Sequence, residues 1–185
     1  MRKLILLRGA QGTGKTTLTK PYRELVVSFD DFRELYAPKV PTLDGDLSLV
    51  LSNSAQKKVV RATFDAAEER MRLGATVIVD TMNLRQKDQT NWVGLAKKYQ
   101  YEVLMVDAQG ETTDEELIER NERRGEKRVP VDALLASAAL GRERHIHPAI
   151  REVSPDDLHS EIAGHTDWRL FAVESVARDR RLVRG

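Results

Sequence analysis

The sequence of 185 residues contains no cysteine and few aromatic residues, 5% of the chain. Without cysteine it can form neither disulfides nor a metal site built on thiolates. No apolar run approaches the roughly 18 residues that a membrane-spanning helix needs. The net charge is only +1. Overall charge therefore does not indicate nucleic-acid binding, and any basic surface must be local.

The remaining composition is ordinary for a globular protein, with 41% hydrophobic and 32% charged residues. The length suits one α/β core and is short for two domains. We therefore expect a single domain over residues 1–185, with 146–185 as a C-terminal extension of it. Met1 leads directly into the first apolar run, so we expect no signal peptide, no membrane partner and a cytoplasmic location. The sequence does not reveal the oligomeric state.

Short apolar runs alternate with helical patterns along the chain, which favours a central parallel sheet with helices on both faces. Strands are predicted at residues 4–7, 25–29, 76–80, 103–108 and, with a weaker pattern, 168–173. Helices are predicted at 31–36, 55–73 and 86–99, and 37–48 is predicted to be the main loop. The helical stripes predicted to face the core are Val60, Phe64, Ala67 and Met71, and Trp92, Leu95, Ala96 and Tyr99.

A glycine-rich segment follows the first predicted strand and precedes a helix. Gly9, Gly14, Lys15 and Thr16 fill the pattern G-x-x-x-x-G-K-[ST], the P-loop of nucleotide-binding proteins. Its backbone amides and the helix N-terminus would cradle phosphates, Lys15 would reach the β and γ phosphates, and the Thr16 hydroxyl would ligate Mg²⁺. The predicted ligands are therefore ATP and Mg²⁺. The loop residues predicted to bind the nucleotide are Gly9, Gln11, Gly12, Thr13, Gly14, Lys15, Thr16 and Thr17.

Two predicted strands end in acidic residues, at the edge of the sheet where ligands bind in α/β proteins. Asp30 and Asp31 follow the second strand, where one carboxylate could accept a proton from an attacking hydroxyl or could cap the next helix. Asp80 ends the third strand, where it could hold Mg²⁺ or act as a cap. The sequence leaves both alternatives open.

Basic residues gather in "ERNERRGEKRVP", residues 119–130. Gly125 and Pro130 would interrupt the helix that carries the first arginines, so this segment could close over a nucleotide as a lid and stabilise charge on a transferring phosphoryl group. The alternative is a solvated helix end whose cations complement the helix dipole. The basic tail at 178–184 could likewise contact nucleic acid or remain solvated.

Four motifs, taken in order, resemble the kinase domain of phage-type polynucleotide kinases. They are "GAQGTGKTT", "FDDFRELY", "VDTMNL" and "RNERRGEKRVPVDAL", and "LAKKYQYEV" is also similar. The resemblance implies a P-loop kinase fold with an arginine-bearing lid at about 120–130. It also implies an ATP-dependent kinase that phosphorylates the 5′-hydroxyl ends of DNA or RNA, a nucleic acid repair activity.

The same resemblance assigns roles to individual residues. Asp30 would be the general base and Arg33 would grip a phosphate of the acceptor strand. Arg124 would reach the transferring phosphoryl group beside Lys15, and Arg120 would support the lid and the nucleotide. The acceptor side would be formed by Asp30, Arg33, Asp80, Thr81 and Asn83, with Thr16 and Asp80 at the metal.

The chain departs from this family at three places: Met82 stands between Thr81 and Asn83, Gln11 replaces the proline common in the family's loop, and no Asp-x-Asp-x-Thr element follows, so no 3′-phosphatase is expected. Two other functions stay open. One is a P-loop kinase of a small molecule such as a nucleotide, sugar or antibiotic. The other is an ATPase or nucleotide-binding module without an acceptor, although no Asn-Lys-x-Asp segment of a GTPase is present.

Overall fold

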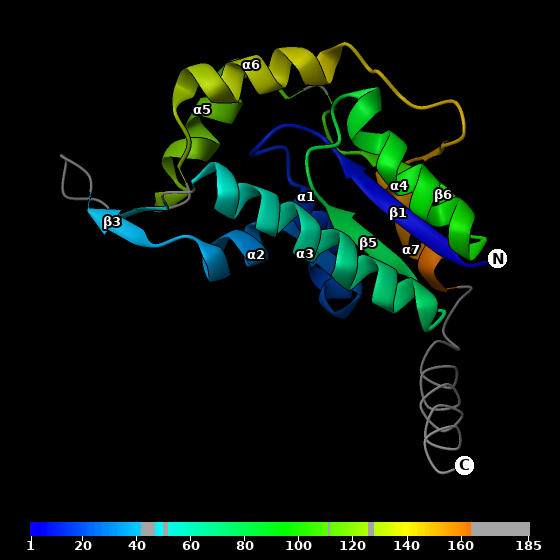
Figure 1. The fold of residues 1–185 in the computed structure, drawn as a ribbon. Helices are drawn as coiled ribbons and strands as arrows, with labels where there is room; N and C mark the ends of the chain where they lie inside the picture. The colour runs from blue at the N-terminus through cyan, green and yellow to red at the C-terminus, as the bar shows by residue number, and fades with distance from the viewer. Residues whose placement is uncertain (42–46, 50–51, 111, 126–127, 164–185) are drawn as a thin grey trace.

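A computed structural model describes residues 1–41, 47–49, 52–110, 112–125 and 128–163 of the chain (Figure 1). The strands are β1 (Lys3–Arg8), β2 (Val26–Ser28), β3 (Lys39–Pro41), β4 (Leu47–Leu49), β5 (Val77–Asp80), β6 (Glu102–Asp107) and β7 (Arg151–Val153). The α-helices are α1 (Lys15–Thr19), α2 (Phe29–Tyr36), α3 (Asn53–Arg72), α4 (Gln86–Tyr99), α5 (Asp114–Glu122), α6 (Val131–Arg142) and α7 (Leu158–Ala163). Short 3-10 turns cover Lys20–Leu25 and Pro155–Asp157.

The main sheet has the order β2-β5-β1-β6-β7, and all four of its strand pairings are parallel. β1 is the central strand. After β1 the chain forms β2 and β5 on one side of it and then β6 and β7 on the other. The carboxyl ends of β1, β5, β2 and β6 therefore share one edge, the edge where open α/β sheets bind ligands. The predicted parallel sheet is confirmed.

Alternate residues of β1 enter two separate hydrophobic clusters, one on each face of the sheet. Leu4 and Leu6 belong to the cluster that includes Ala67 of α3 and Ala96 of α4. Ile5 and Leu7 belong to the opposite cluster, with Leu25 and Leu158 among its other members. Figure 1 shows α3 and α4 in front of the sheet. Within the described part of the chain, no helix is long and apolar enough to span a membrane.

One predicted element needs correction, and one short strand was missed. Residues 37–48 were predicted as one loop, but β3 and β4 form an antiparallel pair there, and prolines are tolerated in such an edge pair. β7 was not predicted because its three residues, "REV", show no apolar pattern. The strand predicted at 168–173, like the basic tail, lies outside the described residues.

The core stripe of α3 is shifted by one residue from the prediction over its first half. Its buried residues are Val59, Thr63, Ala67 and Met71, each one helical turn apart. Val60 and Phe64, which were predicted to face the core, are only partly buried and line a cavity, although Phe64 also packs against the core cluster as predicted. One residue rotates a helical position by about 100°, so α3 presents neighbouring faces to the core and to the cavity.

Candidate active site

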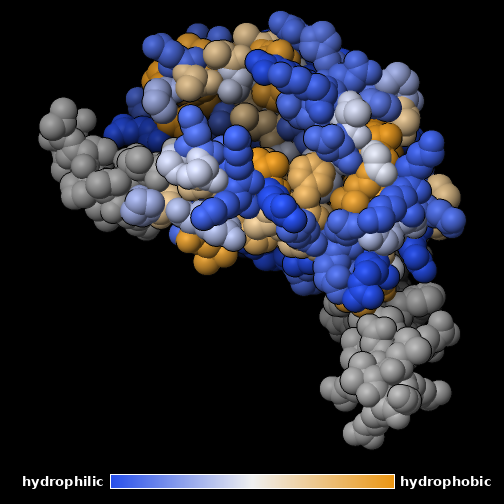
Figure 2. All heavy atoms as spheres, in the orientation of Figure 1, coloured by the Kyte–Doolittle hydropathy of each residue, from blue (hydrophilic) through white to orange (hydrophobic). Residues whose placement is uncertain are grey.

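A large cavity of about 1420 Å³ opens at the carboxyl edge of the sheet. Figure 2 shows hydrophobic residues in a hollow between the hydrophilic surface over α3 and that over α5 and α6. The following predicted site residues line the cavity: Gln11, Gly12, Thr13, Gly14, Lys15, Thr16, Thr17, Asp30, Arg33, Asp80, Thr81, Asn83, Arg120 and Arg124. Of the predicted set only Gly9 is not part of the lining. The structure thus brings together residues that lie up to about 110 positions apart in the sequence.

The P-loop joins β1 to α1 through glycines in backbone conformations that other residues rarely adopt. Gly9 has φ 142°, and a Cβ there would lie 2.6 Å from Thr13 Oγ1. Gly14 has φ 94° directly before α1. These angles turn the loop back on itself, which is how consecutive backbone amides come to face an anion.

Lys15 bends over the P-loop, where its Nζ donates to the backbone oxygens of Gly9 at 2.8 Å and Ala10 at 2.7 Å. Burial lowers the pKa of Lys15 to about 8, while the negative charges of Asp80 and Asp30 oppose that shift. Arg124 adds a smaller lowering of this pKa. The lysine, both carboxylates and the lid arginine are therefore close enough to interact electrostatically.

Thr16 and Asp80 form the predicted metal pair. Thr16 Oγ1 donates to Asp80 Oδ2 at 3.2 Å. Burial raises the pKa of Asp80, against the opposing effects of Lys15 and the Thr16 hydrogen bond. A hydroxyl and a carboxylate are hard oxygen ligands, and Mg²⁺ in nucleotide sites uses only one or two protein ligands besides phosphates and water. The two residues fit that requirement. No cluster of three or more acidic, histidine or cysteine ligands occurs in the described ranges.

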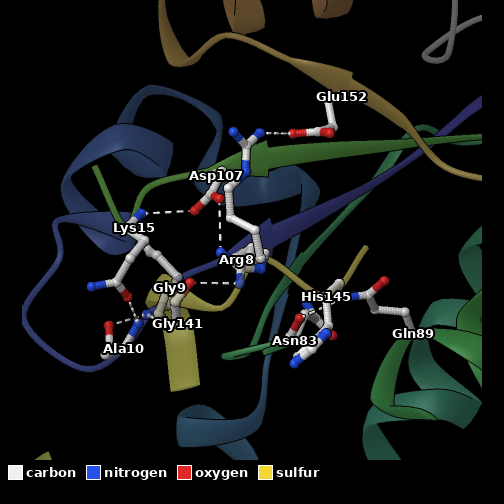
Figure 3. A network of polar contacts seen from close by, with 12 residues as sticks. Arg8, Gly9, Ala10, Lys15, Asn83, Gln89, Asp107, Gly141, His145 and Glu152 are labelled. Carbon is white, nitrogen blue, oxygen red and sulfur yellow. Dashed lines mark hydrogen bonds and ion pairs between the residues drawn. The ribbon is translucent and has the colours of Figure 1, made fainter. Parts of the chain in front are cut away.

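A buried polar network, missed by the sequence analysis, supports the P-loop from beneath (Figure 3). Arg8, fully buried, pairs with Asp107 at 2.7 Å and donates to the backbone oxygen of Gly141 at 2.6 Å. The backbone amide of Ala10 donates to Gln109 Oε1 at 2.9 Å. The loop is thereby tied to the end of β6 and to α6. The sequence did contain one signal for this network, because Arg8 ends an apolar strand and a buried charge requires a partner.

Asn83 lines the cavity, and its side chain also contacts the end of β1 that leads into the P-loop. It is buried, has φ 46°, and its Nδ2 donates to the backbone oxygen of Leu7 at 2.7 Å. The neighbouring Met82 accepts a backbone hydrogen bond from Gly9 at 3.1 Å. Gln89 in turn donates to the Asn83 backbone oxygen at 2.9 Å (Figure 3). These contacts explain why Asn83 is buried, because its side chain helps to hold the P-loop in place. Its contact with an acceptor stays a prediction.

α2 carries Asp30 and Arg33 into the cavity. Its N-cap is Ser28, whose side chain accepts from the Asp30 backbone amide, so neither aspartate is the cap that the sequence left open. Arg33 Nη1 donates to Asp30 Oδ1 at 2.8 Å. Arg33 Nε is buried and has no hydrogen-bond partner among the described residues. Asp31 pairs instead with Arg23 at 2.6 Å and is not part of the cavity lining.

α5 and the turn after it carry the predicted lid arginines. Arg120 Nη1 donates to the backbone oxygen of Gly12 at 3.2 Å, which joins the helix to the P-loop. Arg124 lines the cavity, and its buried Nη1 finds no partner in the described part of the chain. Asn121 joins the two ends of the predicted lid, because its side chain donates to and accepts from the backbone of Val129. Residues 126 and 127 of the predicted lid lie outside the described residues.

Comparison with known proteins supports the same architecture. The model of the AAA domain family matches residues 4–148. No curated protein sequence matches the chain. Solved structures do match it, and 95 chains are similar.

Three of these structures show the kinds of protein that have a similar fold. A chain of the Pnkp1/Rnl/Hen1 RNA repair complex has a TM-score of 0.64 at 19% identity, over 77% of this chain and 44% of that chain. A putative kinase from Chloroflexus aurantiacus has a TM-score of 0.57 at 18% identity, over 89% and 98%. A sugar kinase from Janibacter has a TM-score of 0.53 at 16% identity, over 90% and 95%.

At these identities the likeness concerns the fold, which is that of P-loop kinases. The chain spans less than half the length of the first two matched structures, 44% and 38%. The acceptor must therefore be inferred from the residues of the cavity.

Proposed function

Because the chain belongs to the AAA domain family and has a P-loop kinase fold, we propose that it is an ATP-dependent polynucleotide kinase. It transfers the γ-phosphate of ATP to the 5′-hydroxyl end of DNA or RNA, as its resemblance to phage-type polynucleotide kinases implies. The observation that carries this proposal is the pairing of Asp30 with Arg33 in the cavity that also contains Lys15.

The Asp30–Arg33 pair offers two functions that a nucleic acid end requires. A hydroxyl is a poor nucleophile at neutral pH, so transfer needs a base and in-line placement against the γ-phosphate. Asp30 and Glu34 of α2 both line the cavity, and the charge of Asp30 acts on Lys15, where it raises the pKa against the lowering by burial. Arg33, whose buried Nε has no partner among the residues that the structure describes, supplies a donor for the anionic phosphate next to the reacting nucleoside.

The proposed reaction balances without a further reactant. The 5′-oxygen forms a bond to the γ-phosphorus as the bond from that phosphorus to the bridging oxygen of ADP breaks. Asp30 takes the hydroxyl proton, and the electron pair of the broken bond leaves with ADP. Lys15 and Arg124 stabilise the negative charge on the transferring group and on the leaving oxygen. Magnesium held by Thr16 and Asp80 would neutralise phosphate charge when bound.

A small-molecule kinase is the second candidate. The fold of the Janibacter sugar kinase matches along nearly the whole of both chains, whereas the RNA repair complex chain is matched over less than half its length. A sugar offers hydroxyls but no phosphate next to the reacting hydroxyl. The presence of Arg33 beside the proposed base therefore favours the polynucleotide.

The test is transfer of a radiolabelled γ-phosphate from ATP to a short oligonucleotide with a free 5′-hydroxyl. The matched control is the same oligonucleotide already phosphorylated at its 5′ end. We expect label only on the free end, and no label with Lys15→Ala, which should remain folded because Lys15 is the first residue of the short helix α1 and is only partly buried. ATP hydrolysis without an acceptor, together with no labelled oligonucleotide, would refute the proposal in favour of an ATPase.

A further inference from the structure

One wall of the cavity is not used by the proposed reaction. It comes from the cavity face of α3, where Gln56, Val60 and Phe64 follow one another at intervals of four residues. The facing part of α4 contributes Asn91 and Trp92. We call these five residues the α3–α4 wall.

An aromatic pair forms the centre of the α3–α4 wall. Phe64 and Trp92 stack with ring centroids 3.8 Å apart and an angle of 14° between their planes. Trp92 is only 2% exposed, whereas Phe64 is partly exposed. Trp92 thus fixes the orientation of the Phe64 ring, and Phe64 is the member of the pair that a ligand in the cavity can contact.

The α3–α4 wall is continuous with the proposed reaction centre. Phe29, the residue before Asp30, lines the same cavity and packs against the same core cluster as Phe64. Phe29 and Phe64 thus place two aromatic side chains in the cavity that contains Asp30. Val60, one turn before Phe64, adds an apolar side chain.

Building on the proposed function, we propose that the α3–α4 wall binds the terminal base of the acceptor strand. A base is a planar ring attached to the sugar that carries the reacting hydroxyl, so it must lie within a few bond lengths of Asp30 during transfer. Bases pack on aromatic side chains irrespective of their identity, because every base has a π face. A free sugar would instead leave its hydroxyls against Val60 and Phe64 without hydrogen bonds.

The polar residues of the α3–α4 wall predict that the site accepts any of the bases. Gln56 and Asn91 each carry an amide that can both donate and accept a hydrogen bond. Either amide can therefore satisfy the edge of any base. Lys87, one turn before Asn91, also lines the cavity and adds a positive charge near the strand. The site should select for the presence of a base and not for its sequence.

The test compares two 5′-hydroxyl oligonucleotides that differ only in the first nucleotide, which carries a base in one and is abasic in the other. We expect wild-type kcat/KM to be about tenfold or more higher with the base present. Phe64→Leu keeps an apolar side chain against Trp92 and should remove most of that preference, chiefly by lowering transfer to the end that carries the base. Val60→Ala is a second variant, expected to reduce the preference less.

The matched control is Tyr99→Leu, which changes an aromatic residue packed on the same core cluster but outside the cavity. It should retain the preference. Equal use of both ends by the wild type, or an undiminished preference in Phe64→Leu and Val60→Ala, would overturn the base site while leaving the polynucleotide kinase intact. Failure to phosphorylate either oligonucleotide would overturn both proposals.

Discussion

Arg33 Nη1 donates to Asp30 Oδ1 at 2.8 Å, so the proposed base and the proposed phosphate ligand are paired with each other. The two side chains are half-exposed and lie at successive turns of α2. A ligand can therefore compete with Asp30 for the Arg33 guanidinium. A phosphate of the acceptor strand would draw Arg33 toward itself and leave the Asp30 carboxylate free to accept a proton. Binding of a correct acceptor would thus prepare the base.

The first prediction concerns Arg33. Arg33→Ala should raise the acceptor KM about tenfold or more, since a hydrogen bond to a charged group contributes roughly 1.5–3 kcal/mol. The KM for ATP should stay near the wild-type value. Arg23→Ala is the matched control, because Arg23 pairs with Asp31 outside the cavity. Steady-state kinetics with each substrate varied in turn distinguish the two constants, and an equal rise in both would remove Arg33 from the acceptor side.

The second prediction separates the two adjacent aspartates. Asp30→Asn is nearly isosteric and removes the basic oxygen, so the rate of transfer in a single turnover should fall ~10²-fold or more. Asp31→Asn should have a milder effect because Asp31 contacts Arg23 and does not line the cavity. A larger loss in Asp31→Asn would show that the wrong carboxylate has been assigned as the base.

The third prediction concerns the lid. Arg124→Ala should lower kcat by roughly 10³-fold, the lower end of the effect of an arginine that stabilises phosphoryl-transfer charge. Binding of ATP should weaken much less, because the contact strengthens in the transition state. Arg123→Ala provides the control, since Arg123 is exposed and pairs with Glu119 on α5. If only the KM for ATP changed, Arg124 would be a ground-state ligand.

The fourth prediction concerns stability and pH. Glu161 of α7 accepts from Lys3 of β1 at 2.6 Å and from Arg151 of β7, and these hydrogen bonds lower the pKa of Glu161 to about 2. A lowered carboxyl pKa stabilises the fold above the ordinary value of 4.5, and this contribution is lost as the pH falls toward about 2. Glu161→Gln should therefore reduce the free energy of unfolding by about 1 kcal/mol at neutral pH.

Denaturant unfolding at several pH values checks this prediction. The difference between wild type and Glu161→Gln should shrink as the pH falls from about 5 toward 2. Glu152→Gln removes an exposed partner of Arg144 and should change stability less. A difference that stays constant with pH would show that the contribution of Glu161 does not depend on its charge.

The sequence predicts which residues meet around the P-loop because most of them lie in short, recognisable segments. The P-loop is one contiguous segment, and Asp30 and Asp80 follow recognisable apolar strands. Parallel strands bring such carboxyl ends to one edge, so the proximity of Asp80 to Thr16 follows from topology. The N-cap of α2 could also have been assigned to Ser28, because serine is a favoured N-cap residue and Asp30 and Asp31 stand in the first turn of the helix.

The supporting contacts could not be predicted in the same way. Gln109 contacts Ala10 and Asn121 contacts Val129 through pairings that depend on how loops pack in three dimensions. The two faces of α3 differ by one residue, and hydrophobicity alone does not show that Val60 faces the cavity and Val59 the core. An apolar stripe identifies a buried side of a helix but not whether protein or ligand covers it.

The most direct measurement is phosphoryl transfer from ATP to four acceptors under one condition: a nucleoside, its 3′-monophosphate, a short 5′-hydroxyl oligonucleotide and a free sugar. The pairing of Asp30 with Arg33 predicts that the 3′-monophosphate and the oligonucleotide are phosphorylated efficiently and the plain nucleoside poorly. It also predicts that Arg33→Ala removes this difference. A plain nucleoside or a sugar as the best acceptor would contradict the account and establish a small-molecule kinase.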